Sequence, residues 1–297
     1  MKTKILFLGL LVAALSFSCT KKEDDEPAKM TASDAAVNAK MNSSNDDVSK
    51  IIEDQYQLTS DNATTGRGTE SASVFLPSCA TVVRNPAFGT MPTVGQTVTK
   101  TITFATPFCT LPNGSIVTGQ IIMSFVYDPS LTTHVITYQF VNFYHNAIKY
   151  EGTKTFSWVW SSGNAVNANP HAIVTMNMDM TATINSNVYH RVGQRVNEIS
   201  SDGGTPNWAN WTDNVYRVTG NWVTTFPDGI DQASDITTPL EVSMPCAFQQ
   251  TCAISKGVIT ITKNNVSSTL DYGDGSCDNV AIYTLYGISY NINVGHN

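Results

Sequence analysis

The residues of this chain best suited to chemistry are three aspartates in a short glycine-containing segment, Asp271, Asp274 and Asp278. Carboxylate oxygens are ligands that Ca²⁺ prefers, so the segment is a candidate cation site. Its spacing differs from that of an EF-hand loop, and aspartates beside glycine also form tight turns by bonding their own backbone. We therefore predict a turn here, with calcium binding as the alternative.

Common catalytic signatures are missing from the sequence. There is no Gly-x-Ser-x-Gly, His-Glu-x-x-His, Gly-Lys-Ser/Thr or Cys-x-x-Cys motif. Glycoside hydrolysis needs two carboxylates roughly 5 to 10 Å apart, and nothing in the spacing of Glu151 and Glu198 brings them together. Because these motifs are missing, we predict no metal and no cofactor. A surface hydrolase that uses Asp or Glu is kept as an alternative function. The histidines lack metal-ligand spacing: His134, His145, His171, His190 and His296.

Tryptophan gives the strongest hint of a binding site. Trp208 and Trp211 lie in a polar stretch, residues 203–214, which reads as a loop. Exposed indole rings on a surface with few charges can stack on sugar rings, while the alternative is that they anchor the loop in the core. Trp158 and Trp160 alternate onto one face of a predicted strand, and we expect both to be buried.

The first residues form a targeting segment. Lys2 and Lys4 precede an apolar run, residues 5–15, that is too short to span a bilayer, which takes about 20 apolar residues. The small residues before Cys19 resemble the lipobox of bacterial lipoproteins, in which the thiol is lipidated and becomes the new N-terminus. Two positions depart from that motif, because Ser16 replaces the usual Leu and Phe17 is large. Ordinary cleavage near Ser18 is the alternative.

The residues after Cys19 indicate where the anchor places the protein. Residues 20–26, Thr-Lys-Lys-Glu-Asp-Asp-Glu, are charged and have no apolar side chain to pack. They resemble the lysine-then-acidic tag of surface-exposed lipoproteins of the Bacteroidetes. That resemblance implies an outer-membrane lipoprotein that faces outward, with a periplasm-facing protein as the alternative. We therefore divide this part into a signal peptide, residues 1–18, and a lipid-anchored tether, residues 19–30.

The charge is unevenly distributed along the 297 residues, whose formal net charge is -7. Residues 20–72 hold 6 of the 17 basic and 11 of the 24 acidic side chains. The remaining surface must be covered mainly by Thr, Ser, Asn and aromatic residues. Without a basic patch, nucleic acid is excluded as a partner. The composition favours an extracellular β protein and leaves the oligomeric state open.

The hydrophobic pattern predicts a mainly β fold with a short N-terminal helical segment. Residues 31–60 have helical spacing, interrupted at 42–45, and a second helix should end near Leu58; residues 59–72 read as a flexible link. Short alternating runs from Val74 onward predict one all-β domain, residues 73–297, with possible sub-units 73–245 and 246–297. We expect an antiparallel meander or sandwich-like sheet, with the helix across its open face.

The pairing of residues in the predicted hairpins indicates which cysteines are bonded to each other. An Asn264-Asn265 turn pairs Ile259 with Leu270, and the same register places Cys252 opposite Cys277. Cys79 and Cys109 flank another hairpin-like stretch and form the second predicted pair, which leaves Cys246 unpaired. The segment 271–279 resembles cysteine-flanked hairpins of uncharacterised Bacteroidetes lipoproteins, a resemblance that implies fold and location only.

Together these features predict a lipid-anchored surface protein that acts as a binding or structural module for glycan or protein ligands. Besides the hydrolase, a further alternative is a carrier whose curved sheet holds an apolar ligand against the N-terminal helix.

Overall fold

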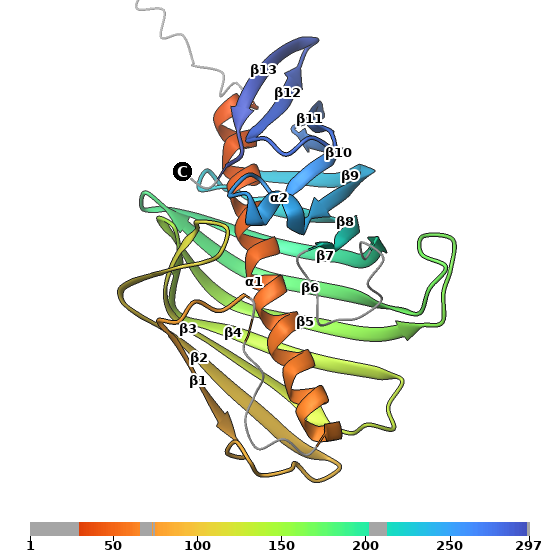
Figure 1. Cartoon of the computed structure of the whole chain (residues 1–297). Helices are drawn as coiled ribbons and strands as arrows, with labels where there is room; N and C mark the ends of the chain where they lie inside the picture. The colour runs from red at the N-terminus through yellow and green to blue at the C-terminus, as the bar shows by residue number, and fades with distance from the viewer. Residues whose placement is uncertain (1–29, 66–72, 74, 202–212, 296–297) are drawn as a thin grey trace, which may run out of the picture.

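The computed structural model describes residues 30–65, 73, 75–201 and 213–295. They form a single thirteen-stranded antiparallel sheet, in which sequential strands are neighbours, and a long helix that crosses one face of it (Figure 1). The predicted antiparallel meander with an N-terminal helix is therefore confirmed. The helices are α1 (Ala32–Thr65) and α2 (Met244–Phe248), and the strands are β1 (Ala80–Asn85), β2 (Gln96–Thr110), β3 (Ile116–Tyr127), β4 (Thr133–His145), β5 (Ile148–Ser161), β6 (His171–Ile184), β7 (Asn187–Ser201), β8 (Val215–Thr225), β9 (Asp231–Ser243), β10 (Ile254–Lys263), β11 (Val266–Asp274), β12 (Val280–Leu285) and β13 (Ile288–Asn293).

Two-residue turns set the register of several hairpins. Asn264 and Asn265 both have positive φ angles, 51° and 62°, and connect the paired residues Lys263 and Val266. Asparagine tolerates this left-handed backbone, which matches the twist of the flanking strands. The predicted turn is confirmed, as is the pairing of Ile259 with Leu270.

Helix α1 is continuous, so the break predicted at residues 42–45 is wrong. Asn42, Ser44 and Asn45 favour turns when their side chains bond the local backbone, but here the three side chains are buried against the sheet and bond it instead. The helix also includes residues 59–65, which were predicted as a link. Its apolar residues belong to the same core as those of the sheet.

Three short segments cover the side of α1 that faces away from the sheet. Phe75, Leu111 and the small helix α2 all approach the helix around Ile51. Ser243 caps α2 by accepting a hydrogen bond from the backbone N–H of Cys246. The middle of α1 is therefore enclosed by the sheet on one side and by these covers on the other.

Each disulfide lies next to one of these covers. Cys79 is bonded to Cys109, as predicted, with Cα atoms 5.9 Å apart. Cys246 is bonded to Cys277, with Cα atoms 5.0 Å apart, and Cys252 is a buried free thiol. The predicted Cys252–Cys277 bond and the unpaired Cys246 are therefore wrong.

A β-bulge explains the error. The predicted register holds at Val258, which pairs with Asp271, but Lys256 pairs with Asp274, one residue out of step. Gly257 lies between them with φ 108°, and a Cβ there would come within 2.5 Å of the Pro239 carbonyl oxygen. Cys252 precedes β10, whereas α2 brings Cys246 to Cys277.

β9 and β10 pair across residue 245, so the sheet continues through the proposed sub-unit boundary.

Candidate functional site

A stripe of polar side chains on α1 faces the sheet. Asp34, Asn38, Asn42 and Asp46 recur every four residues, which places them on one face of the helix. Asn38, Asn42 and Asp46 are buried, and their partners are cationic side chains of the sheet. The helix–sheet contact is therefore a polar network set within an apolar core.

Two arginines of β7 form the centre of this network. Arg191 donates from Nη1 to Asn42 Oδ1 at 2.9 Å and from Nη2 to Asn38 Oδ1 at 2.6 Å. Arg195 donates from Nη1 to Asp46 Oδ1 at 3.0 Å. Both guanidinium groups lie near the ring of the buried Trp222, at 5.3 and 4.6 Å from its centroid. Burial lowers the pKa of Arg191 to about 9, with the charge of Arg195 adding to the effect.

Two lysines of the sheet also belong to the network. Lys100 of β2 donates to the backbone carbonyl of Gln55 at 2.7 Å. Lys154 of β5 donates to Asn45 Oδ1 and is fully enclosed. Burial lowers the pKa of Lys154 to about 7, and the charge of Arg195 lowers it further against the opposite effect of Asp46. Burial also raises the pKa of Asp46 above its ordinary value.

Ser44, His145 and Asp47 form a hydrogen-bonded relay at the same interface. Ser44 Oγ lies 3.0 Å from His145 Nδ1, and His145 Nε2 lies 2.7 Å from Asp47 Oδ2. Asp47 also accepts from Ser115 Oγ at 3.0 Å and from Asn113 Nδ2 at 2.6 Å. The order of groups is that of a nucleophile, a base and an orienting carboxylate.

A cavity of about 270 Å³ borders this relay. Ser44 and His145 line it together with Lys40, Asn146 and Asn185. Ser44 is only 3% exposed and His145 1%. The relay is therefore enclosed like the arginine and lysine contacts beside it, and burial alone explains why its polar groups are paired.

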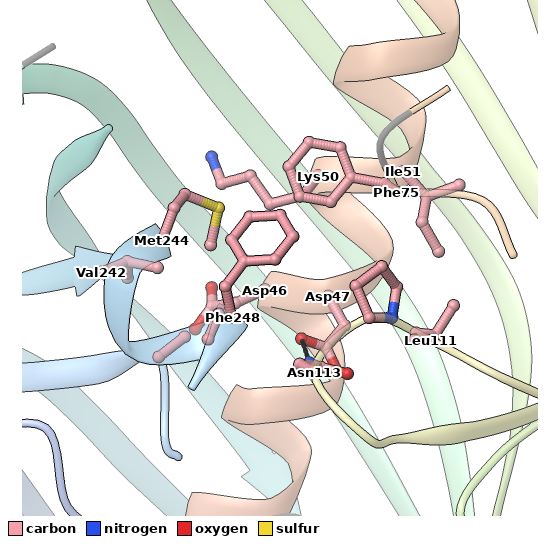
Figure 2. A pocket seen from close by; sticks show the side chains of 13 residues that line it. Asp46, Asp47, Lys50, Ile51, Phe75, Leu111, Asn113, Val242, Met244 and Phe248 are labelled. Atoms are coloured by element: carbon pink, nitrogen blue, oxygen red, sulfur yellow. Dashed lines mark hydrogen bonds between the residues drawn. The ribbon is translucent and has the colours of Figure 1, made fainter. Parts of the chain in front are cut away.

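A second cavity, about 30 Å³, lies between the middle of α1 and its covers. In Figure 2, Phe75, Met244 and Phe248 surround it from the covering segments, with Asp46 and Lys50 on the helix. The Lys50 ammonium lies 3.1 Å from Glu53 Oε2 and 3.1 Å from the centroid of the Tyr216 ring. This volume is enough for about one water molecule and too small for an apolar ligand.

The glutamates proposed for hydrolysis do not meet. Glu151 of β5 pairs with Thr181 of β6, which in turn pairs with His190 of β7. His190 lies eight residues from Glu198 along β7. At about 3.3 Å per residue, the positions of the two glutamates are separated by roughly 26 Å along the strand direction. Glu198 instead lies 2.8 Å from His171 Nε2 and also accepts from Asn164.

The three aspartates of the glycine-containing segment form turns, as predicted. Asp271 accepts from the backbone N–H of Gly273, and Asp274 accepts from that of Ser276. Asp278 likewise accepts from the N–H of Val280. Among the residues that the structure describes, no group of three His, Cys, Asp or Glu side chains is arranged to hold a metal ion.

The tryptophans have different environments. Trp158 is buried against Tyr56 of α1, with ring centroids 5.5 Å apart, as expected. Trp160 is 53% exposed at the end of β5, so the prediction that it is buried is wrong. Trp208 and Trp211 lie outside the described residues, as does Cys19, so their proposed roles remain predictions.

A continuous row of polar side chains crosses the outer face of the sheet, opposite α1. Each member is the direct cross-strand partner of the next, and none is buried. Every side chain in this outer polar row is a hydroxyl or an amide except one aspartate. In order from β1 to β13 the row is Asn85, Thr99, Ser124, Thr137, Thr155, Asn177, Gln194, Asn221, Asp235, Thr260, Thr269, Thr284 and Ser289.

Sequence reasoning missed both the buried network and the outer polar row. The first had a usable signal: Lys100 stands between Val98 and Ile102 in a strict alternation, so it occupies an inward position. Arg191 and Arg195 follow the same rule on β7. The row had no such signal, because its members come from thirteen strands whose relative register the sequence does not state.

Neither described helix has the length and apolar character needed to cross a bilayer. Comparison of the chain with protein-family models, curated proteins and solved structures yields no significant match. Its function must therefore be inferred from its own residues.

Proposed function

We propose that this protein is a lipid-anchored binding module of the bacterial cell surface and that its ligand is an extended neutral glycan. The outer polar row carries the proposal. Neighbouring strands lie about 4.8 Å apart, so the row presents hydroxyl and amide groups at a regular interval along one line. These groups both donate and accept hydrogen bonds, as sugar hydroxyls do.

The charge of the outer face supports a neutral ligand over an acidic or basic one. On β1 to β4 the row members and the other outward-facing residues of each strand are uncharged, with Thr97, Thr99, Thr101 and Thr103 all on the outer side of β2. Asp235 is the one charged member of the row. A charged ligand would lack complementary partners along β1 to β4.

The two other functions considered fit the geometry less well. An apolar ligand held between the sheet and α1 would have to separate Arg191, Arg195 and Lys154 from their helix partners, at a large cost in free energy. A hydrolase that pairs Glu151 with Glu198 would need carboxylates far closer than these positions, roughly 26 Å apart along the strand direction, allow.

The anchor is proposed from the sequence alone. Cys19 follows an apolar run and precedes a charged tether, so we propose that its thiol carries the lipid and that it begins the mature chain. Intact-mass measurement of the membrane-extracted protein tests this directly. An unmodified Cys19, or a mature chain that starts elsewhere, would remove the anchor from the proposal.

A glycan array probed with the full chain tests the ligand. We expect binding to neutral polysaccharides that the double variant Thr137→Lys/Asn177→Lys abolishes, because both changes place a cation within the row. The matched control is Thr133→Lys/Thr183→Lys, which adds the same charge to the same strands outside the row. Equal loss in both variants, or capture of a protein ligand in place of glycans, would contradict the proposal.

A further inference from the structure

The hairpin of β12 and β13 exposes a dense group of apolar side chains at one edge of the sheet. Tyr286 at its tip is 74% exposed and Ile288 57%, and Tyr290 is also exposed. Val280 and Ile282 are exposed on the opposite side of the same hairpin. Residues 279–293 contain no Asp, Glu, Lys or Arg. An apolar group of this kind on a secreted protein calls for a partner surface.

The position of the hairpin in the chain indicates that partner. Helix α1 begins beside β13 (Figure 1). Just before the helix, Met30 is buried, and its sulfur lies 2.7 Å from Ser268 Oγ of β11. Only ten residues, 20–29, separate Met30 from Cys19. A chain of that length spans at most about 35 Å.

We propose that the β12–β13 hairpin inserts its tip into the interfacial region of the bilayer that holds the Cys19 lipid. This inference rests on the proposed lipid anchor. The short tether keeps the hairpin close to the bilayer, and tyrosine is a residue that favours the boundary between headgroups and acyl chains. A second copy of the chain is the competing occupant, because β13 is an edge strand with an open hydrogen-bonding side.

Contact of the hairpin with the bilayer determines which end of the sheet lies away from the membrane. α1 starts at this edge and crosses the strands toward the opposite one, so β1 to β4 lie at the far end of the sheet from the bilayer (Figure 1). The uncharged outer side of these strands is then held away from the membrane. The outer polar row runs from the membrane toward the surroundings.

The test uses the full-length lipidated protein in vesicles of phosphatidylethanolamine and phosphatidylglycerol. A polarity-sensitive fluorophore is attached to Ile288→Cys, and the matched control carries it at Val135→Cys, which replaces an exposed apolar residue on β4. We expect a blue shift and quenching by nitroxide-labelled lipids at position 288 and neither effect at position 135. Equal behaviour of the two labels, with Cys19 lipidated by intact mass, would overturn the hairpin contact and leave the anchor intact.

A second measurement separates the hairpin from the anchor. The Cys19→Ser chain, which has no lipid, should still float with these vesicles, and adding Tyr286→Ser and Ile288→Ser should reduce that binding at least about tenfold. Sedimentation of the Cys19→Ser chain alone tests the competing occupant. A dimer that the hairpin changes convert to monomer would assign this surface to a second copy and overturn the proposal.

Discussion

Arg195 of β7 donates a hydrogen bond to Asp46 of α1 at 3.0 Å, and both side chains are almost completely buried. One partner comes from the N-terminal helix and the other from the middle of the sheet, so the bond joins parts of the chain 149 residues apart. A buried charge that loses its partner is left without solvation. The pair therefore ties α1 to the centre of the sheet.

Removing one side of this pair should destabilise the protein strongly. We expect Arg195→Met to lower the free energy of unfolding by about 3 to 5 kcal/mol, because it leaves Asp46 buried and unpaired. The double variant Asp46→Leu/Arg195→Met should lose less than the sum of the two single changes. Urea denaturation of all four proteins gives the coupling.

The exposed pair of Lys256 and Glu241, 3.3 Å apart, is the matched control. Lys256→Met should change the free energy of unfolding by less than about 1 kcal/mol. If the losses in the free energy of unfolding of Asp46→Leu and Arg195→Met simply add in the double variant, the buried contact contributes nothing to stability.

Lys154 should make stability rise with pH. Its pKa is about 7 in the folded protein and about 10.4 when unfolded, so between these values the unfolded chain binds more protons. The free energy of unfolding should then increase as the pH is raised from about 7 to about 9. Arg191, whose pKa burial lowers to about 9, acts in the same direction toward the upper end of this range.

Lys154→Met removes this titration, so the rise should be smaller in the variant, while Lys50, whose pKa burial also lowers, still acts in the same direction. Guanidinium denaturation at several pH values below 9 is the measurement, because above about pH 10 the buried tyrosines, whose pKa values burial raises, act in the opposite direction. An unchanged pH dependence in the variant would exclude Lys154 as its source.

Cys252 should be unreactive in the native protein. It is 1% exposed, and burial raises the pKa of its thiol to about 12, so almost no thiolate is present at neutral pH. We expect iodoacetamide to modify it only after denaturation without reductant. Peptide mapping of the unreduced protein should show Cys79 joined to Cys109 and Cys246 joined to Cys277. Rapid native labelling, or a peptide that links Cys252, would contradict the arrangement.

Ser44 should behave as a structural residue despite its relay with His145 and Asp47. Its hydroxyl is enclosed by α1 and the sheet, so a fluorophosphonate probe should leave the native protein unlabelled. Ser44→Ala should lower the free energy of unfolding by about 1 to 3 kcal/mol, since His145 Nδ1 then loses its partner. Labelling that both Ser44→Ala and His145→Gln abolish would identify a nucleophile and make a hydrolase the leading function in place of the binding module.

Gly119 and Gly95 form a matched pair for testing steric space. Their φ angles are 87° and 85°, so replacing either by Ala imposes similar backbone strain. A Cβ at Gly119 would lie 2.0 Å from the carbonyl oxygen of Asn142, whereas a Cβ at Gly95 would meet nothing within 4 Å. Thermal unfolding should therefore show a far larger loss for Gly119→Ala. Equal losses of thermal stability in the two variants would mean that backbone strain alone accounts for the effect.

The sequence alone determined the class of fold and the local turns. Period-two alternation from Val74 onward specified strands, and Asn264-Asn265 specified a hairpin turn, because both signals depend on neighbouring residues. Local chemistry also predicted the turns at Asp271, Asp274 and Asp278, whose carboxylates bond backbone groups two residues away.

The tertiary structure decided everything that depends on residues distant in the chain. Asn42 to Asn45 read locally as a helix break, yet the sheet supplies Arg191, His145 and Lys154 as partners, and these contacts override the weak helix propensity. One extra residue in β11, opposite Gly257, changed which cysteine reaches Cys277. The outer polar row exists only because twelve successive strand pairings bring single residues into line, and no local sequence pattern specifies the register of these pairings.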